Sequence, residues 1–222
     1  MNQLAWSKMS GKMVGIPALN TDTTTNKFCI AKSKDKDSIC SECYSWNMLK
    51  TFRKNAVPRF KMNSDILSSR VLEMNELVRP NGNHVRFNAH GELINTYHVQ
   101  NLVNYALFYP KVTFTLWTKK KALIQSFFNK HKKPDNLILI YSNEIVGTVY
   151  KSVPKHFDKV FNVVNSSLQT VNCDGKCIDC MMCYTQGNKT EQIIEKIKKR
   201  NAKNVLHMNC NTCNLTNHIR RI

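Results

Sequence analysis

Apolar residues recur along the chain with two different periods, and segments of the two kinds alternate. Helical spacing of apolar residues predicts helices over residues 44–57, 64–78, 97–107, 120–130 and 191–200. Short apolar runs predict strands over residues 84–89, 112–117, 137–141, 160–164 and 205–208. Pro58 is expected to end the first helix, and a turn at 79–82 to end the second. Because strands and helices alternate, the pattern predicts βαβ units with parallel strand pairing.

The predicted elements place the chain in the α/β class. Parallel βα units form a barrel or an open sheet, and eight complete units need about 250 residues. The chain has 222 residues, so an incomplete, partly TIM-like barrel or an open sheet is expected. Residues 1–170 are expected to form this barrel-like domain, with an N-terminal cysteine loop. Residues 171–222 are expected to form a cysteine-rich segment packed on the domain.

The charge balance of the chain is strongly basic. Lys and Arg number 33 against 15 Asp and Glu, which gives a formal net charge of +18. A field of this sign attracts polyanions, so a nucleic-acid or nucleotide partner is one interpretation and a solvated lysine-rich surface is the other. The sequence has no apolar run of 18 residues and no apolar leader at its start, which predicts a cytoplasmic protein that does not enter a membrane.

Nine cysteines give the chain its most distinctive chemistry. Because nine is an odd number and no leader is seen, metal binding is favoured over a disulfide framework. The first group, Cys29, Cys40 and Cys43, has the spacing C-x10-C-x2-C and leads into the helix expected at Tyr44. Three cysteine ligands can hold a [4Fe–4S] cluster with one iron left open. Zn²⁺ with a fourth ligand from elsewhere is the alternative.

A second group of cysteines lies late in the chain and is denser. Four cysteines fall within eleven residues: Cys173, Cys177, Cys180 and Cys183. This set can enclose a metal ion or a cluster without distant ligands, and a zinc knuckle that grips nucleic acid is the alternative. The remaining pair, Cys210 and Cys213, has two histidines nearby, His207 and His218. It could supply ligands to either group or consist of bystander thiols.

Polar residues follow the predicted strands at their carboxyl ends, where catalytic and binding residues gather in parallel α/β folds. They are His90, Gly91 and Glu92 after one strand, Lys119 after the next, and Ser142 and Asn143 after the third. Glu92 and His90 are the candidate catalytic residues, and His90 would act as an acid, a base or an orienting group. The candidates for binding a cofactor are Gly91, Glu92, Ser142 and Asn143. A turn-forming Gly-Glu pair without a functional role is the alternative.

The order of these motifs resembles the radical S-adenosylmethionine superfamily. In that family a cysteine loop follows the first strand, and the second strand ends in a Gly-Gly-Glu motif that contacts the methionine part of the cofactor. Here residues 13–18 would be the first strand, and the cysteine loop would end at Cys43. Gly91 and Glu92 match the last two motif positions, and His90 stands in the first. The resemblance implies an S-adenosylmethionine cofactor, and the late cysteines would then form a closed auxiliary cluster.

The chain also resembles a phage protein family of unknown function, the gene product 88 family. Its members carry an early Cys…C-x2-C-Tyr, a strand that ends in Gly-acidic, and a late Cys…C-x2-C-x2-C-aromatic. The matching stretches are CSECY at 40–44, NAHGE at 88–92 and CIDCMMCY at 177–184. This resemblance implies a viral origin, and hence the cytoplasm of a host, but it supplies no activity.

Two functions of different class follow from these observations. The first is an iron–sulfur enzyme with one or two [4Fe–4S] clusters that resembles radical S-adenosylmethionine enzymes and acts on an anionic nucleotide or nucleic-acid substrate. The second is a non-catalytic protein in which Zn²⁺ or Fe–S sites stabilise a basic surface for nucleic acid. A third hypothesis is the binding of a host protein, with metal serving only the fold.

Overall fold

The computed structural model of the chain describes residues 3–165, 170–173 and 175–197. Its strands form one sheet in sequence order: β1 (Trp6–Ser7), β2 (Ala18–Leu19), β3 (His84–Phe87), β4 (Thr113–Thr118), β5 (Leu137–Ser142), β6 (Lys159–Val164) and β7 (Gln192–Lys196). β1 pairs with β2 in antiparallel orientation, and every later pair of neighbours is parallel. The α/β class and the parallel pairing predicted from the sequence are therefore confirmed.

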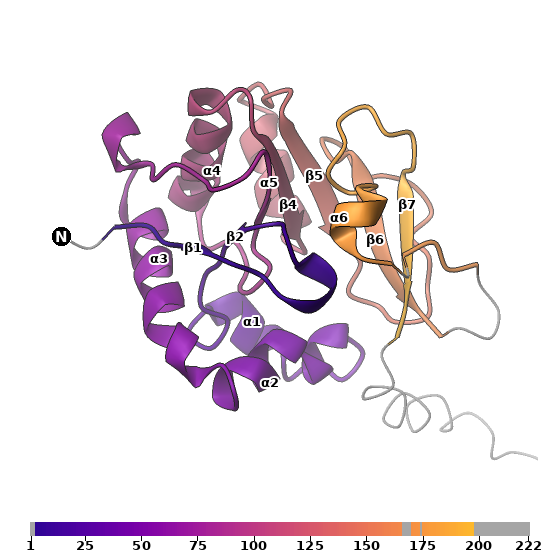
Figure 1. The fold of residues 1–222 in the computed structure, drawn as a ribbon. Helices are drawn as coiled ribbons and strands as arrows, with labels where there is room; N and C mark the ends of the chain where they lie inside the picture. The colour runs from indigo at the N-terminus through magenta and orange to yellow at the C-terminus, as the bar shows by residue number, and fades with distance from the viewer. Residues whose placement is uncertain (1–2, 166–169, 174, 198–222) are drawn as a thin grey trace, which may run out of the picture.

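The sheet is open, because no pairing joins β7 back to β1 within the described part of the chain. The helices are α1 (Lys27–Lys32), α2 (Tyr44–Lys50), α3 (Val57–Ser69), α4 (Thr96–Phe108), α5 (Lys121–Phe128) and α6 (Cys177–Cys180), with 3-10 turns η1 (Gly11–Met13), η2 (Ile39–Glu42), η3 (Lys54–Ala56) and η4 (Met74–Glu76). Right-handed crossovers between successive neighbouring strands place their helices on one face. Accordingly, α3, α4 and α5 lie against one face of the sheet and α6 lies against the other (Figure 1). Among the described residues, no helix is both long enough and apolar enough to cross a bilayer.

Both faces of the central strands are buried. On β4, Phe114 and Leu116 point toward α4 and α5 and belong to the main core. Trp117 on β4 and Ile140 on β5 point the other way and pack with Tyr184, which follows α6. Strands that are buried on both faces are continuous apolar runs in the sequence, which is why the pattern located these strands.

The segment predicted as a helix over 191–200 is instead the strand β7, and that prediction is wrong. Ile193 and Ile194 pair with Phe161 and Asn162 of β6. A short apolar run fits a strand as well as a helix, and its period alone does not separate the two. The unpaired edge of β6 offers hydrogen-bonding groups, and pairing with that edge decides the outcome. The strand predicted over 205–208 lies outside the described residues.

The early helices also differ from the prediction. α2 ends at Lys50, and α3 begins one residue before Pro58, so this proline starts a helix rather than ending one. A proline fits the first helical turn because the N–H that it lacks is not needed there. α3 ends before Arg70, whose carbonyl accepts a hydrogen bond from Asn101 Nδ2 at 2.8 Å. Of the strand expected over 13–18, only the end is present, as β2.

Candidate active site at the carboxyl edge of the sheet

The loop that carries the first cysteine group is held over the carboxyl ends of two distant strands. Asn26 caps α1, and its side-chain oxygen accepts a hydrogen bond from the N–H of Cys29 at 3.2 Å. Asn26 Nδ2 donates to the carbonyl of Glu92, after β3, at 2.9 Å. Further along the loop, Ile39 N–H donates to the carbonyl of Glu144, after β5, at 2.7 Å. The cysteine loop therefore bridges the ends of β3 and β5.

The other two cysteines of this group are also placed by hydrogen bonds. Cys40 lies in η2, which Ser38 caps by accepting from Cys40 N–H at 3.2 Å. Cys43 directly precedes α2, and the hydroxyl of the next residue, Tyr44, donates to the carbonyl of Ala89 at the end of β3. All three cysteines thus belong to one loop that is fixed to the carboxyl edge of the sheet.

Lys119, which follows β4, belongs to the same site. Its Nζ donates to Ser142 Oγ at 3.2 Å, and its backbone N–H donates to Glu92 Oε2 at 2.8 Å. Burial disfavours the charge of Lys119, but the neighbouring Cys40, Glu92 and Cys43 together raise its pKa above the usual value. A cation in this position stabilises negative charge on the thiols or on an anionic ligand.

Burial disfavours the ionisation of two thiols of the first group, Cys29 and Cys40. Burial raises the pKa of the Cys29 thiol far above its usual value, and Glu92, Cys43 and Cys40 raise it further. Burial also raises the pKa of Cys40, although Lys119 opposes this shift. Within the described part of the chain, no three His, Cys, Asp or Glu side chains are arranged to hold a metal ion. Metal binding by Cys29, Cys40 and Cys43 therefore stays a prediction.

Glu92 is buried, and its carboxylate is held by the chain itself. Oε1 accepts hydrogen bonds from Thr118 Oγ1 at 2.6 Å and from Leu93 N–H at 2.7 Å. Oε2 accepts from the backbone of Lys119, as described above. These bonds fix the orientation of the carboxylate and leave Oε2 with capacity for one more donor. The predicted contact with a cofactor would have to use that remaining position.

His90 is packed between β3 and α2. Its Nδ1 shares a hydrogen bond of 2.8 Å with Ser45 Oγ, and its ring lies 5.8 Å from that of Tyr44. Burial lowers the pKa of His90 to about 4, with Arg53 and Arg86 adding to the effect, so the ring is neutral at pH 7. A neutral, buried ring with these contacts suits the orienting role expected for His90 better than proton transfer to a ligand.

Gly91 permits a close approach between two backbone segments. Its φ is +83°, and an added Cβ would lie 2.1 Å from Thr21 Oγ1 and 2.5 Å from the Thr21 carbonyl oxygen. Its N–H donates to Thr23 Oγ1 at 2.9 Å. Both observations show that no side chain fits here, so the Gly-Glu pair has a structural cause whatever its function.

The two polar residues after β5 have different environments. Ser142 joins the site through its bond to Lys119. Asn143 is buried and shapes its own loop, because its Nδ2 donates to the Thr148 carbonyl at 3.1 Å and its Oδ1 accepts from Ile145 N–H at 3.2 Å. The structure therefore brings Ser142 together with the first cysteine group, whereas the amide of Asn143 is already occupied.

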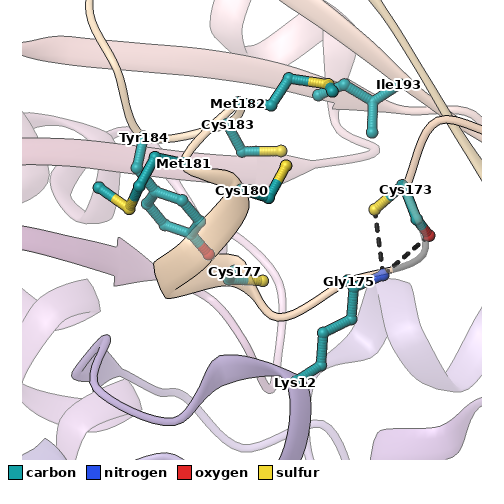
Figure 2. Close-up of a pocket in the computed structure, with 10 residues that line it drawn as sticks. All are labelled: Lys12, Cys173, Gly175, Cys177, Cys180, Met181, Met182, Cys183, Tyr184 and Ile193. Atoms are coloured by element: carbon teal, nitrogen blue, oxygen red, sulfur yellow. Dashed lines mark hydrogen bonds between the residues drawn. The ribbon is translucent and has the colours of Figure 1, made fainter.

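The late cysteine group lies on the α6 face of the sheet (Figure 2). Its four cysteines and Lys12 line a cavity of about 20 Å³, which has room for about one water molecule or ion. Lys12 Nζ donates to Cys173 Sγ at 3.1 Å and forms an ion pair of 2.8 Å with Glu195. Burial works against the charge of Lys12, but these two partners raise its pKa above the usual value. Four thiols thus surround a small cavity, but the described side chains are not arranged to hold a metal ion.

Arg86 is a notable residue that the sequence pattern did not single out. Its guanidinium carbon lies 3.9 Å from the centroid of the Trp117 ring on the α6 face, and its Nε is buried without a hydrogen-bond partner in the described part of the chain. Burial disfavours its charge, but Tyr184 and nearby tyrosine and cysteine side chains raise its pKa. The available signal was a charged residue between Val85 and Phe87, in a strand whose two faces are both buried.

One family model matches this chain: that of gene product 88, over residues 3–167. The chain belongs to the gene product 88 family. The stretches CSECY and NAHGE of this gene product 88 protein lie inside the match, whereas Cys173 and the later cysteines lie beyond its end. No curated protein and no solved structure matches the chain. The family is therefore confirmed, and the likeness to radical S-adenosylmethionine enzymes stays a hypothesis.

Four residues considered as metal ligands lie outside the described residues: Cys210, Cys213, His207 and His218. Their predicted roles are untested.

Proposed function

We propose that this gene product 88 protein is an iron–sulfur enzyme that resembles radical S-adenosylmethionine enzymes and acts on an anionic nucleotide or nucleic-acid substrate. The observation that carries the proposal is the position of the first cysteine loop, which bridges the carboxyl ends of β3 and β5. The same edge carries Glu92 and Lys119. In parallel α/β folds this edge is where active sites form.

The chemistry of the donors fits a [4Fe–4S] cluster, but the arrangement of their side chains does not yet form a site. Three thiols in one loop would bind three irons and leave the fourth open. The described side chains form no ready metal-binding group, so Cys29, Cys40 and Cys43 would have to turn toward a common point. Because burial raises the pKa of Cys29 and Cys40, a bound cation is what would stabilise their thiolates. When bound, the cluster would supply one-electron reduction.

The residues around the loop have roles that do not depend on the cluster. The Lys119 ammonium would bind an anionic group of a substrate or cofactor, and Ser142 would hold that ammonium in place. Glu92 Oε2 would accept a hydrogen bond from an amine, because its carboxylate is already oriented by Thr118. These three residues would therefore bind a ligand that carries both a positive and a negative group.

The test begins with protein purified without oxygen and reconstituted with iron and sulfide. We expect a brown protein with about four irons for each cluster it holds. The variant C29A/C40A/C43A should lose the iron of the first site, and the matched variant C177A/C180A/C183A should retain it. With S-adenosylmethionine and a reductant, the wild-type protein and the matched variant should form 5′-deoxyadenosine, and C29A/C40A/C43A should not.

Two outcomes would contradict the proposal. One is a colourless protein that retains stoichiometric zinc after reconstitution. The other is an iron content that C29A/C40A/C43A does not change, which would exclude this loop as the cluster site.

A second candidate function is a non-catalytic nucleic-acid-binding protein stabilised by Zn²⁺ or an Fe–S cluster. The observation that favours it is the packing of Cys173, Cys177 and Cys183 against the core on the α6 face. Thiols in this position would couple a metal ion to the stability of the fold. Removal of zinc by a chelator should then lower the free energy of unfolding, while 5′-deoxyadenosine never forms. A chelator without effect on unfolding would exclude this function.

A further inference from the structure

We infer that the outer side of the α2–α3 region binds a single-stranded nucleic acid. This strand-binding surface consists of Lys50, Phe52, Arg53, Lys54 and Arg59. The inference names a substrate class and a surface for the proposed function. It rests on that function only for the claim that the bound strand is also the substrate.

Every charged residue of the α2–α3 region before Asp65 is a cation. Between Glu42 and Asp65 the sequence has five cationic residues and no acidic one. Lys61 is the cation nearest to Asp65 and pairs with it at 2.9 Å, so it is not part of the surface. Lys54 and Arg59 are exposed, and a phosphate chain that passes them would gain their charge without breaking an ion pair between described residues.

An aromatic residue lies between these cations in the sequence. α2 ends at Lys50, and the turn that follows leaves Phe52 with 69% of its surface exposed. A single exposed apolar residue is ordinary in a soluble protein. Here, however, Phe52 is directly followed by Arg53 and Lys54. Alternation of cations with an aromatic face is the arrangement that binds single strands, because phosphates meet the charges and an unpaired base stacks on the ring.

The strand-binding surface lies beside the candidate active site. The inner side of α2 is fixed to the end of β3, through the bond of Ser45 to His90 and that of Tyr44 to Ala89. Glu92 follows two residues after His90. A strand on the outer side of α2 would therefore run past the loop that carries the first cysteine group.

A single strand fits this surface better than the two other polyanions that a basic patch attracts. In a duplex the bases are paired and stacked, so they could not stack on Phe52. An anionic membrane surface would require a broad apolar face to enter the interface. The residues on either side of Phe52 in the sequence, Thr51 and Arg53, are instead polar or charged.

The test measures binding of the full chain to a fluorescent single-stranded oligonucleotide of mixed sequence, by anisotropy over a series of salt concentrations. We expect affinity to fall steeply with salt. K54Q/R59Q should reduce the slope of log K against log salt by about 1.4, since each phosphate contact to a single strand contributes about 0.7. The control K130Q/K132Q removes two exposed charges beyond α5 and should leave the slope unchanged. F52A should weaken binding by about tenfold, and F52W should restore it.

Three results would overturn the inference. They are an equal loss of affinity in K130Q/K132Q, an F52A variant that binds like wild type, and equal binding of a duplex or of anionic phosphatidylserine vesicles. The variant C29A/C40A/C43A separates this inference from the proposed function. If that variant binds the strand normally but forms no 5′-deoxyadenosine, both hold. If strand binding fails in wild-type protein that still forms 5′-deoxyadenosine, only the strand-binding surface is wrong.

Discussion

Replacing Gly91 by alanine tests how tightly the end of β3 is packed against the cysteine loop. The backbone of Gly91 has φ +83°, a conformation that L-residues rarely adopt. The new Cβ would lie 2.1 Å from Thr21 Oγ1 and 2.5 Å from the Thr21 carbonyl oxygen. The second atom belongs to the backbone, so a change of side-chain rotamer cannot relieve the overlap. The two segments would have to move apart.

The expected loss of stability has two parts. The positive φ lowers the free energy of unfolding of the alanine variant by about 1–2 kcal/mol. The lower conformational entropy of its unfolded chain offsets about 0.4–1 kcal/mol of this loss. Separation of tightly packed segments costs about 1–3 kcal/mol more. We therefore expect Gly91→Ala to lower the free energy of unfolding by about 2–4 kcal/mol.

Gly147 provides a matched control, because its φ is +80° and an added Cβ would meet no atom within 4 Å. Gly147→Ala should therefore show only the conformational part, about 1 kcal/mol or less. Urea unfolding followed by circular dichroism gives both values. Equal losses in the two variants would refute the close approach of Gly91 to Thr21.

Two further predictions concern buried polar side chains. The folded pKa of His90 is lowered to about 4, so between about pH 6.5 and 4 only the unfolded chain binds a proton at this residue. His90 therefore lowers the free energy of unfolding by about 1.4 kcal/mol for each unit by which the pH drops in this range. Urea unfolding at pH 7 and pH 5 should show a smaller pH effect in His90→Asn, and an unchanged effect would contradict the assignment. Asn101 accepts from Leu72 N–H and donates to the Leu67 and Arg70 carbonyls. Asn101→Leu should cost about 3 kcal/mol or more in the same assay, since three backbone groups lose their partner, and a loss below about 1 kcal/mol would contradict this.

The central sheet could be predicted from the sequence because its strands are apolar on both faces. Residues 112–117, 137–141 and 160–164 were located within one or two residues of β4, β5 and β6. β7 was missed because its apolar residues also fit helical spacing, and only the free edge of β6 determines its conformation. Pro58 was misjudged because a proline is compatible with the start of a helix as well as with its end.

The candidate site could be located in part. The rule that polar residues gather at strand ends predicts that Glu92, Lys119 and Ser142 lie in one site, and hydrogen bonds join Lys119 to both of the others. The bond from Asn26 that fixes the cysteine loop could not be predicted, because it joins residues 66 positions apart. Arg86 was missed because a charged residue on a buried sheet face is recognised only once the neighbouring strands are known.

The sequential order of the strands also governs how the protein assembles as it is synthesised. β3 to β6 each pair with the next strand along the chain, so these pairs can form as their residues emerge. The first cysteine loop depends on partners that are made later, since Ile39 bonds to the carbonyl of Glu144. Its thiols therefore remain without their final surroundings until more than one hundred further residues have been added. The folded position of this loop is therefore available to a metal ion or cluster only after the sheet beneath it has formed.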